Sequence, residues 1–437
     1  MFRYKSGFIV RGDIMLIQFN FKNFKSFRDE ATLDLSATNL KNYSDRVVKI
    51  GKEKLLTLAA IYGANASGKS NVYDAFSYMS NYVVQSFMFG DTEDEFEFNN
   101  ELTPFLFDEK TIKSESSFEV YFTIPSDMSG KVYNYGFCLN KKEITEEWFN
   151  VKAKTSKESR RIFYRNTVEK ELDLSGIPQT NRDNIKIALD KKVLIASLGS
   201  KLKISKCKLV RDWFFSNELV DFGDTFTNFL MQSRMPNHFI DDKEIQKKVV
   251  NFLATFDGHI RDFKIEKIPN TDSKPQPDSY AVSSLHKMIN SDKMAEIPLN
   301  EESDGTLKMF RLYPYLQKVI EKGSVFFVDE LNARLHPLLV RNFLLTFLNP
   351  KINKNHAQLI FTTHDTWHLS NKFLREDEIW FVEKDENGLS TLYSLADFSD
   401  DVQDGNLKNY EELYLVGRYG AIPKVQLIDF LGGNSDE

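Results

Sequence analysis

The chain has 437 residues, of which 41% are apolar and 27% are charged, and its formal net charge is −6. This composition is typical of a soluble globular protein with two or three domains, and the negative charge argues against nucleic-acid binding through a globally basic surface. The two cysteines match no metal-ligand spacing, and no apolar run reaches the roughly 18 residues of a membrane-spanning helix. We therefore expect a cytoplasmic protein with reduced thiols and no membrane partner.

The sequence begins with an extension and leads into two predicted strands. Residues 1–14 lack the long apolar stretch and the small-residue cleavage site of a signal peptide, so we interpret them as an extension outside the fold. The alternation in LIQFNFKNF, from Leu16 to Phe24, predicts an edge or sandwich strand. The apolar run Leu55–Gly63 indicates a buried strand that leads into a loop. After Ser70, apolar residues at helical spacing predict a helix.

The loop between this strand and this helix has the spacing of a phosphate-binding loop: glycine, four residues, then Gly68, Lys69 and Ser70. In such a loop, backbone N–H groups and the helix N-terminus bind phosphate oxygens. The lysine reaches the β- and γ-phosphates, and the serine hydroxyl is a ligand of Mg²⁺. A glycine-rich turn is the alternative, but the strand–loop–helix context favours a nucleotide site. The predicted nucleotide-binding residues are Gly63, Ala64, Asn65, Ala66, Ser67, Gly68, Lys69, Ser70 and Asn71.

The middle of the chain carries weaker signals. Two strand-like segments, SSFEVYFTI and KVYNYGFCL, indicate a second sheet before residue 140. Residues 141–295 are lysine-rich and contain helical patterns around Asp183–Lys203 and Lys243–Phe256, without heptads or repeats, so we expect a mainly helical insertion. Its positive charge suits contacts with a nucleic-acid backbone, with a solvated helical face as the alternative, and the candidates are Lys201, Lys203, Lys206 and Lys208.

The last third of the sequence contains three further candidate elements. The turn Ser303–Gly305 opens a predicted helix, where it would form either an anion site or an ordinary N-cap. The strand Ser324–Glu330 ends in two carboxylates, of which Asp329 would hold Mg²⁺ and Glu330 would orient and deprotonate a water molecule. The next strand ends at His364, which can hydrogen-bond a γ-phosphate, although a lone histidine is more often structural.

The order of these elements resembles the ABC-type ATPase heads shared by SMC proteins, RecF and the overcoming-lysogenization-defect (OLD) nucleases. NFKSF (Asn23–Phe27) resembles their first-strand motif, GANASGKSN their Walker A motif and ESDGT their signature motif. DELNARLHP (Asp329–Pro337) resembles the Walker B motif and D-loop of the OLD-like branch. YLVGRYGAIP (Tyr414–Pro423) is similar to the C-terminal stretch of short defence-associated members, the RloA and AbiLi type. The likeness covers residues 15–140 and 295–425.

This resemblance implies an α/β fold, an ABC-type ATPase head with a mixed sheet around the phosphate loop and an antiparallel β lobe. It divides the chain into the extension 1–14, two head halves at 15–140 and 296–437, and the insertion 141–295.

The resemblance also implies that ATP and Mg²⁺ bind between two heads arranged head to tail. Ser303 and Gly305 of one subunit would contact the γ-phosphate held by Lys69 of the other. Asn332 and Arg334, in the D-loop position, would face that interface. The signature motif departs from the usual run of glycines, and no clear Q-loop glutamine is found.

Beyond Asp365 the chain is too short for the nuclease domain of OLD enzymes, and the insertion lacks the heptads of SMC arms. The resemblance therefore implies a stand-alone ATPase, dimeric or larger, of a bacterial anti-phage or abortive-infection system. Lys69, Glu330 and His364 would be its catalytic residues. Its partner would be a separately encoded effector, a nuclease or a toxin, that the ATP cycle controls. The alternative is a RecF- or SMC-like ATPase that acts on DNA.

Overall fold

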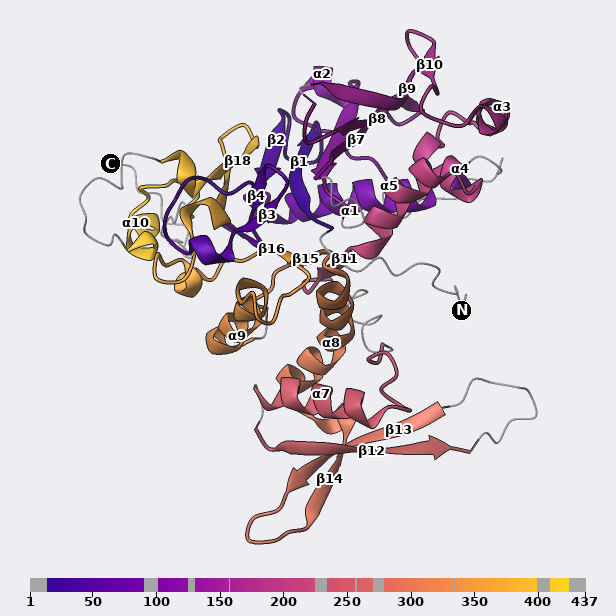
Figure 1. Ribbon diagram of the computed structural model, residues 1–437. Coiled ribbons are helices and arrows are strands. Elements are labelled where there is room, and N and C mark those ends of the chain that lie inside the picture. The colour runs from indigo at the N-terminus through magenta and orange to yellow at the C-terminus, as the bar shows by residue number, and fades with distance from the viewer. Residues whose placement is uncertain are drawn as a thin grey trace, which may run out of the picture.

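The computed structural model describes residues 14–89, 101–124, 130–156, 158–224, 234–255, 258–269, 279–333, 335–398 and 409–423. Its strands form two large sheets, a three-stranded sheet and a two-stranded sheet. Figure 1 shows the three-stranded sheet at the far end of the molecule from one of the large sheets. No helix within these ranges is both long and apolar enough to cross a membrane.

One large sheet is the core of the molecule, and its strands lie in the order β11 (Glu218–Asp221), β15 (Val325–Asp329), β16 (Gln358–Thr362), β5 (Leu58–Tyr62), β17 (Ile379–Lys384) and β18 (Ser390–Ser394). The pairs from β11 to β17 are parallel, and β18 is antiparallel to β17. Every residue of β5, β15 and β16 is buried, as is typical of parallel strands covered on both faces. Alternate side chains of these strands enter two separate hydrophobic cores, one shared with α1 (Lys69–Gln85) and the other with α8 (Asp304–Lys322) and α9 (Pro337–Leu348).

The other large sheet is antiparallel throughout, and its strands lie in the order β10 (Glu171–Asp173), β9 (Ser159–Asn166), β8 (Ile144–Lys152), β7 (Val132–Leu139), β6 (Ser116–Phe122), β1 (Leu16–Lys22) and β2 (Ala31–Asp34). Helix α1 lies between this sheet and the core sheet. The ring centroid of Phe76 on α1 is 5.2 Å from that of Phe19 on β1 and 5.8 Å from that of Phe327 on β15. Because α1 packs on both sheets, the loop at its start is held relative to both.

The remaining elements surround these sheets. Helices α3 (Gln179–Ala188), α4 (Ile195–Lys201) and α5 (Ser205–Ser216) follow β10, and α4 and α5 pack on α1. Helix α7 (Lys243–Ala254) packs on the three-stranded sheet of β12 (Ile260–Ile268), β13 (Ser279–Lys287) and β14 (Met294–Pro298) at one end of α8 (Figure 1). The short elements are β3 (Val48–Ile50), β4 (Glu53–Leu55), α2 (Glu109–Ile112), α10 (Tyr410–Leu415) and the 3-10 helices η1 (Ser44–Arg46), η2 (Ser86–Met88), η3 (Leu299–Glu301), η4 (Thr366–His368), η5 (Glu376–Glu378) and η6 (Leu395–Asp397).

The expected α/β fold, with a mixed sheet behind the phosphate loop and an antiparallel lobe, is confirmed. The stretch 141–295 differs from the mainly helical insertion that we expected. It contains α3, α4, α5 and α7, but it also adds β8–β10 to the antiparallel sheet and β11 to the core sheet, and it includes β12, β13 and the first two residues of β14. The reason is visible in β8, where buried and partly exposed side chains alternate with the period of a half-buried strand.

Gln358 connects the two large sheets at the start of β16. Its side-chain Oε1 accepts a hydrogen bond from the backbone N–H of Leu16 at 2.6 Å, and its Nε2 donates to the carbonyls of Leu16 and Leu56, each at 2.9 Å. The residue is fully buried, so this one amide satisfies three backbone groups that have no access to water.

We expect Gln358→Leu to destabilise the protein, because the substitution leaves these buried backbone groups unpaired at a cost of about 1–3 kcal/mol each. The free energy of unfolding, measured by urea denaturation, should fall by about 3 kcal/mol or more. Gln179→Leu, at the exposed start of α3, is the matched control and should change it by less than about 0.5 kcal/mol. Equal losses in the two variants would contradict the role of Gln358.

Candidate nucleotide-binding site

The predicted phosphate loop lies between the carboxyl end of β5 and the start of α1. Two of its residues must be glycine. At Gly63 (φ +151°) a Cβ atom would lie 2.4 Å from the carbonyl oxygen of Val382, and at Gly68 (φ +109°) it would lie 2.6 Å from Oγ of Ser390. Both glycines therefore allow the loop to approach neighbouring strands more closely than any side chain permits.

Two side chains of the loop fit a phosphate group. The hydroxyl of Ser67 is buried and has no hydrogen-bond partner among the described residues. Nζ of Lys69 donates to the carbonyls of Gly63 and Ala64 at 2.9 and 2.8 Å, and burial lowers the pKa of this amine. An unpaired buried hydroxyl and a half-buried cation at a helix N-terminus are the donors that a phosphate accepts. The residues present therefore fit a nucleoside triphosphate.

Hydrogen bonds from other parts of the fold support the phosphate loop. Oγ of Ser390, at the start of β18, donates to the carbonyl of Ser67 at 2.6 Å and lies 2.7 Å from Oγ of Ser26. Asn71 on α1 donates from Nδ2 to the same Ser26 hydroxyl at 2.6 Å. Ser26 belongs to the NFKSF motif, so this motif and Asn71 support the loop. Sequence reasoning missed Ser390, which nothing in the local pattern around β18 distinguishes.

Asp329 lies at the carboxyl end of β15, where the sequence placed it. Its carboxylate accepts hydrogen bonds from the hydroxyls of Thr362 and Ser70. Burial raises its pKa, and these two hydrogen bonds oppose that rise. The structure therefore brings together Ser70 and Asp329, the two residues predicted to hold Mg²⁺. Carboxylate and hydroxyl oxygens are the ligands that Mg²⁺ prefers in proteins.

Glu330 follows in an unusual backbone conformation. Its φ of +53° is in the left-handed region, and its N–H donates to Oγ1 of Thr362 at 2.9 Å. A non-glycine residue in this region costs roughly 1–2 kcal/mol and persists where the surroundings hold it. This conformation turns the chain at the end of β15, and a Cβ atom on Gly223 would lie 3.2 Å from Oε2 of Glu330. The carboxylate thus lies at the loop that follows β11.

His364 is exposed just beyond the end of β16. Its Nε2 is 3.2 Å from Nδ2 of Asn332, and Oδ1 of Asn332 accepts a hydrogen bond from Oγ1 of Thr363 at 2.9 Å. Asn332 therefore links the loop after Glu330 to the histidine strand within one chain. Arg334, the other predicted interface residue, lies outside the described residues.

Asp221 is a second acidic strand end that sequence reasoning missed. Strand β11 pairs parallel with β15, with Asp221 in register with Asp329. Burial and then the charge of Asp329 raise the pKa of Asp221 to about 6. The only local signal was a four-residue strand ending in aspartate and followed by a glycine two residues on. Asp221 lies next to Asp329 only because β11 pairs with β15, and the local sequence does not indicate that pairing.

The turn Ser303–Gly305 forms the start of α8. Oγ of Ser303 accepts a hydrogen bond from the N–H of Thr306 at 3.2 Å, so the serine is the N-cap of this helix. Ser303 and Asp304 are exposed. In Figure 1 this end of α8 lies toward α7, whereas α1 lies beyond the other end of α8. Among the described residues, no hydrogen bond joins this turn to the phosphate loop, Asp329, Glu330 or His364, although Lys308, one turn further along α8, donates to the carbonyl of Ala333 in the loop after Glu330.

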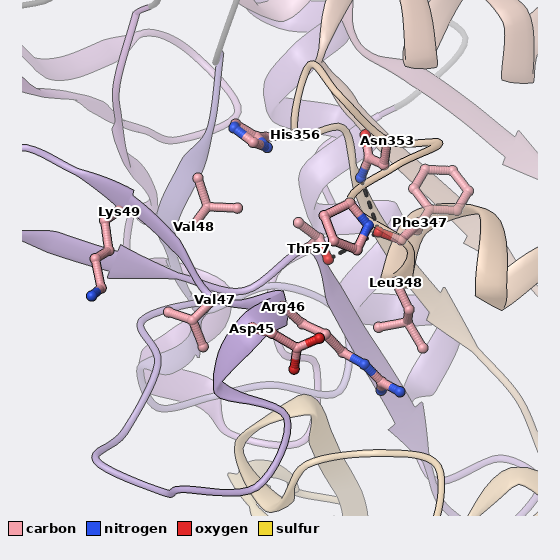
Figure 2. Close-up of a pocket in the computed structure, with 11 residues that line it drawn as sticks. Asp45, Arg46, Val47, Val48, Lys49, Thr57, Phe347, Leu348, Asn353 and His356 are labelled. Carbon is pink, nitrogen blue, oxygen red and sulfur yellow. Dashed lines mark hydrogen bonds between the residues drawn. The ribbon is translucent and has the colours of Figure 1, made fainter.

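A cavity of about 180 Å³ lies at the opposite, amino-terminal edge of the core sheet (Figure 2). It is lined by η1, by the start of β3, and by residues around the end of α9. The side chains of Thr57 and Asn353, which precede β5 and β16, both donate to the carbonyl of Phe347, at 3.2 and 3.0 Å. Because the predicted nucleotide-binding residues lie at the carboxyl edge, this cavity is separate from the candidate site.

A family model described as "AAA domain, putative AbiEii toxin, Type IV TA system" matches residues 58–367 of the chain. No curated protein matches this chain. Among solved structures it is similar to the SMC head domain from Thermotoga maritima, with 16% identity, a TM-score of 0.40, and coverage of 87% of this chain and 98% of that one. It is also similar to RecF with ATP, a recombination mediator protein of the RecFOR pathway, with 11% identity, a TM-score of 0.37, and coverage of 89% and 100%.

We expect Ser390→Ala to weaken nucleotide binding, because it leaves the buried carbonyl of Ser67 without its hydrogen bond and loosens the loop. A loss of about 1–2 kcal/mol corresponds to roughly 5- to 30-fold lower affinity, which titration with a fluorescent ATP analogue would measure. Thr391→Ala, one residue on and exposed, is the control and should bind as the unchanged protein does. Unchanged affinity in Ser390→Ala would show that the contact does not support the loop.

Proposed function

The chain belongs to this AAA-domain family, and we propose that it is a Mg²⁺-dependent ATPase whose heads dimerise around ATP to control a separately encoded effector. The observation that carries the proposal is that the Gly63–Asn71 loop, Asp329, Glu330 and His364 all follow the carboxyl ends of parallel strands in one sheet. Ligands of open α/β sheets bind at this edge.

Each of these groups has a role in the proposed hydrolysis. The loop binds the phosphates through its backbone N–H groups, and Lys69 turns from the carbonyls it now contacts to the β- and γ-phosphates. Glu330 orients the attacking water and takes its proton. His364, placed by Asn332, donates a hydrogen bond to the γ-phosphate. Lys69, Glu330 and His364 are therefore the catalytic residues of this proposal.

Ser70 and Asp329 would hold Mg²⁺, because they are already joined by a hydrogen bond beside the loop. The ion would neutralise charge that develops on the phosphate oxygens. Asp221, in register with Asp329, adds a further carboxylate at this edge. Burial is the main reason why the pKa of Asp221 is raised, and the charge of Asp329 adds to the rise; a divalent cation would relieve the repulsion between the two carboxylates.

Gly305 supports a site completed by a second subunit. Among the residues that the structure describes, a Cβ atom on Gly305 would meet nothing closer than Oγ of Ser303, at 3.9 Å. A glycine inside a helix costs about 0.5–1 kcal/mol relative to alanine, and no contact in the described part of the chain requires one here. We attribute it to close approach by a molecule outside the chain, namely the γ-phosphate held by Lys69 of a partner head.

The family description names a toxin of a type IV toxin–antitoxin system, and this supports our proposal of an ATPase in an anti-phage or abortive-infection system. In this proposal the two head halves and the insertion form one unit, and the effector is a nuclease or a toxin encoded separately. Dimer geometry set by ATP would hold or release that effector.

A RecF- or SMC-like ATPase acting on DNA is the second candidate, and one surface favours it. Nζ of Lys201 is 4.9 Å from the ring centroid of Phe87, and the guanidinium of Arg211 is 5.8 Å from both Phe87 and Phe215. Phe215 is 54% exposed, and cations beside exposed aromatic rings suit a nucleic-acid strand. One observation opposes nucleic-acid binding here: Nζ of Lys208, a predicted phosphate contact, is 3.4 Å from a carboxylate oxygen of Asp212, which neutralises its charge.

Co-expression with the product of the neighbouring gene, followed by purification with and without ATP, tests the defence proposal. We expect a nuclease or toxin to co-elute in an ATP-dependent manner. Absence of such a partner, together with salt-sensitive DNA binding and DNA-stimulated hydrolysis, would favour the second candidate and overturn the first.

Glu330→Gln should bind ATP normally but hydrolyse it about 10²- to 10⁴-fold more slowly, because the amide cannot accept the proton of the attacking water. The variant should accumulate as an ATP-bound dimer, which size-exclusion chromatography with light scattering would detect. Turnover at the rate of the unchanged protein would exclude Glu330 as the base.

Ser303→Arg should leave ATP binding by each monomer unchanged and reduce hydrolysis by about 10²-fold or more, because a large cation at the N-cap blocks the approach of the partner head. Fluorescent nucleotide titration and steady-state hydrolysis would separate the two effects. Mixing Ser303→Arg with Lys69→Ala should restore part of the activity, since one intact composite site forms in the mixed dimer. Full activity of Ser303→Arg alone would refute the head-to-tail site.

A further inference from the structure

Glu302, the residue immediately before the Ser303–Gly305 turn, is a buried carboxylate tied to a different part of the fold. Its side chain is 6% exposed, and its Oε1 lies 2.6 Å from Nε2 of His286. The hydroxyl of Ser284 donates to the same carboxylate oxygen. Ser284 and His286 are both on β13, the central strand of the three-stranded sheet. The start of α8 is therefore fastened to this sheet through one side chain.

This contact differs from the ordinary surface ion pairs of the same sheet. The pair Lys264–Glu296, which joins β12 to β14, has side chains 42% and 40% exposed. Exposed pairs contribute little to stability, whereas removing one partner of a buried pair leaves an uncompensated polar group. Loss of the contact between Glu302 and His286 should therefore cost more stability than loss of the exposed Lys264–Glu296 pair.

The cluster is not arranged as a hydrolytic relay. In a serine–histidine–carboxylate relay, opposite ring nitrogens of the histidine contact the hydroxyl and the carboxylate. Here the same nitrogen, Nε2 of His286, is 3.2 Å from Oγ of Ser284 and 2.6 Å from Oε1 of Glu302. The geometry suits holding a segment in place.

From this point a continuous series of contacts leads to Glu330. One turn along α8 from Gly305, Nζ of Lys308 donates to the carbonyl of Ala333 and lies 3.6 Å from the ring centroid of Phe222. The N–H of Ala333 donates to the carbonyl of Glu330 at 2.9 Å. The start of α8 is therefore in contact both with the three-stranded sheet and with the loop that carries the proposed catalytic base.

We propose that Glu302 is a positioning residue through which the three-stranded sheet controls ATP hydrolysis. The sheet sets the position of Glu302, Glu302 sets that of the Ser303–Gly305 turn, and Lys308 transmits the position of α8 to the Glu330 loop. A shift of the sheet would move the turn out of reach of the partner's nucleotide without disturbing the phosphate loop. The inference rests on the proposed ATPase function and adds its means of regulation.

The test compares Glu302→Ala, His286→Ala and Glu302→Gln, with Lys264→Ala as the control on the same sheet. Three quantities are measured: binding of a fluorescent ATP analogue to the monomer, ATP-induced dimerisation in the Glu330→Gln background, and kcat for hydrolysis. We expect Glu302→Ala and His286→Ala to lower kcat about 3- to 30-fold and to weaken dimerisation, with monomer binding changed less than about twofold. Lys264→Ala should match the unchanged protein in all three.

Glu302→Gln keeps an acceptor oxygen in the same place, so it should restore at least half of the lost kcat. Normal kcat in Glu302→Ala, equal losses in Glu302→Gln and Glu302→Ala, or a loss confined to monomer binding would each overturn the proposal. Thermal melting identifies a variant that fails to fold, and His286→Ala then carries the test from the other side of the contact. If the unchanged protein hydrolyses no ATP, the proposed function itself fails, whereas an active protein with insensitive variants refutes only the role of Glu302.

Discussion

The contact among Ser26, Ser67 and Ser390 is the constraint on which the rest of the site depends. It joins the turn after β1, the phosphate loop and the start of β18, which are far apart in sequence. Gly68 lies directly against two of these hydroxyls, so the loop can occupy this place only without a side chain there. With the loop fixed, α1 takes its direction from it and packs between the two large sheets. The contacts that fix the phosphate loop therefore also fix how the two large sheets pack on α1.

Fixing the loop at this edge has an electrostatic consequence. The ends of β11 and β15 place Asp221 beside Asp329, and Glu330 follows in a left-handed conformation. Lys69 is the cation that the loop brings to these groups, and burial lowers its pKa. Burial also raises the pKa of Asp329, because a desolvated carboxylate loses the stabilisation of water. A site with more negative than positive charge is complete only with a further cation, which supports the proposed Mg²⁺-dependent reaction.

The parts of the fold that could be predicted from sequence are those whose signal is local. Strands β5, β15 and β16 are largely apolar because both faces of the sheet are covered there, and each leads into residues that the proposed chemistry uses. The phosphate loop was recognisable because its glycines and its lysine lie within eight positions. Ser390, Asp221 and Glu302 were missed for the opposite reason. Ser390 and Asp221 have ordinary sequence neighbourhoods, and their roles depend on contacts with residues far along the chain, Ser26 and Ser67 for Ser390 and Asp329 for Asp221. Glu302 begins the ESDGT motif, but nothing in that motif indicates its contact with Ser284 and His286 on β13.

The same distinction explains why the insertion was expected to be mainly helical. Helical periodicity can be recognised within one segment, whereas β8–β11 are strands because they extend sheets begun elsewhere in the chain. This has a functional consequence, since a segment that contributes β11 to the core sheet cannot move independently of the nucleotide site. The three-stranded sheet is different. It shares no strand with the core and contacts it around α8, where Glu302 lies between β13 and the Ser303–Gly305 turn. This separation from the sheet behind the phosphate loop is what the proposed regulatory role of Glu302 depends on.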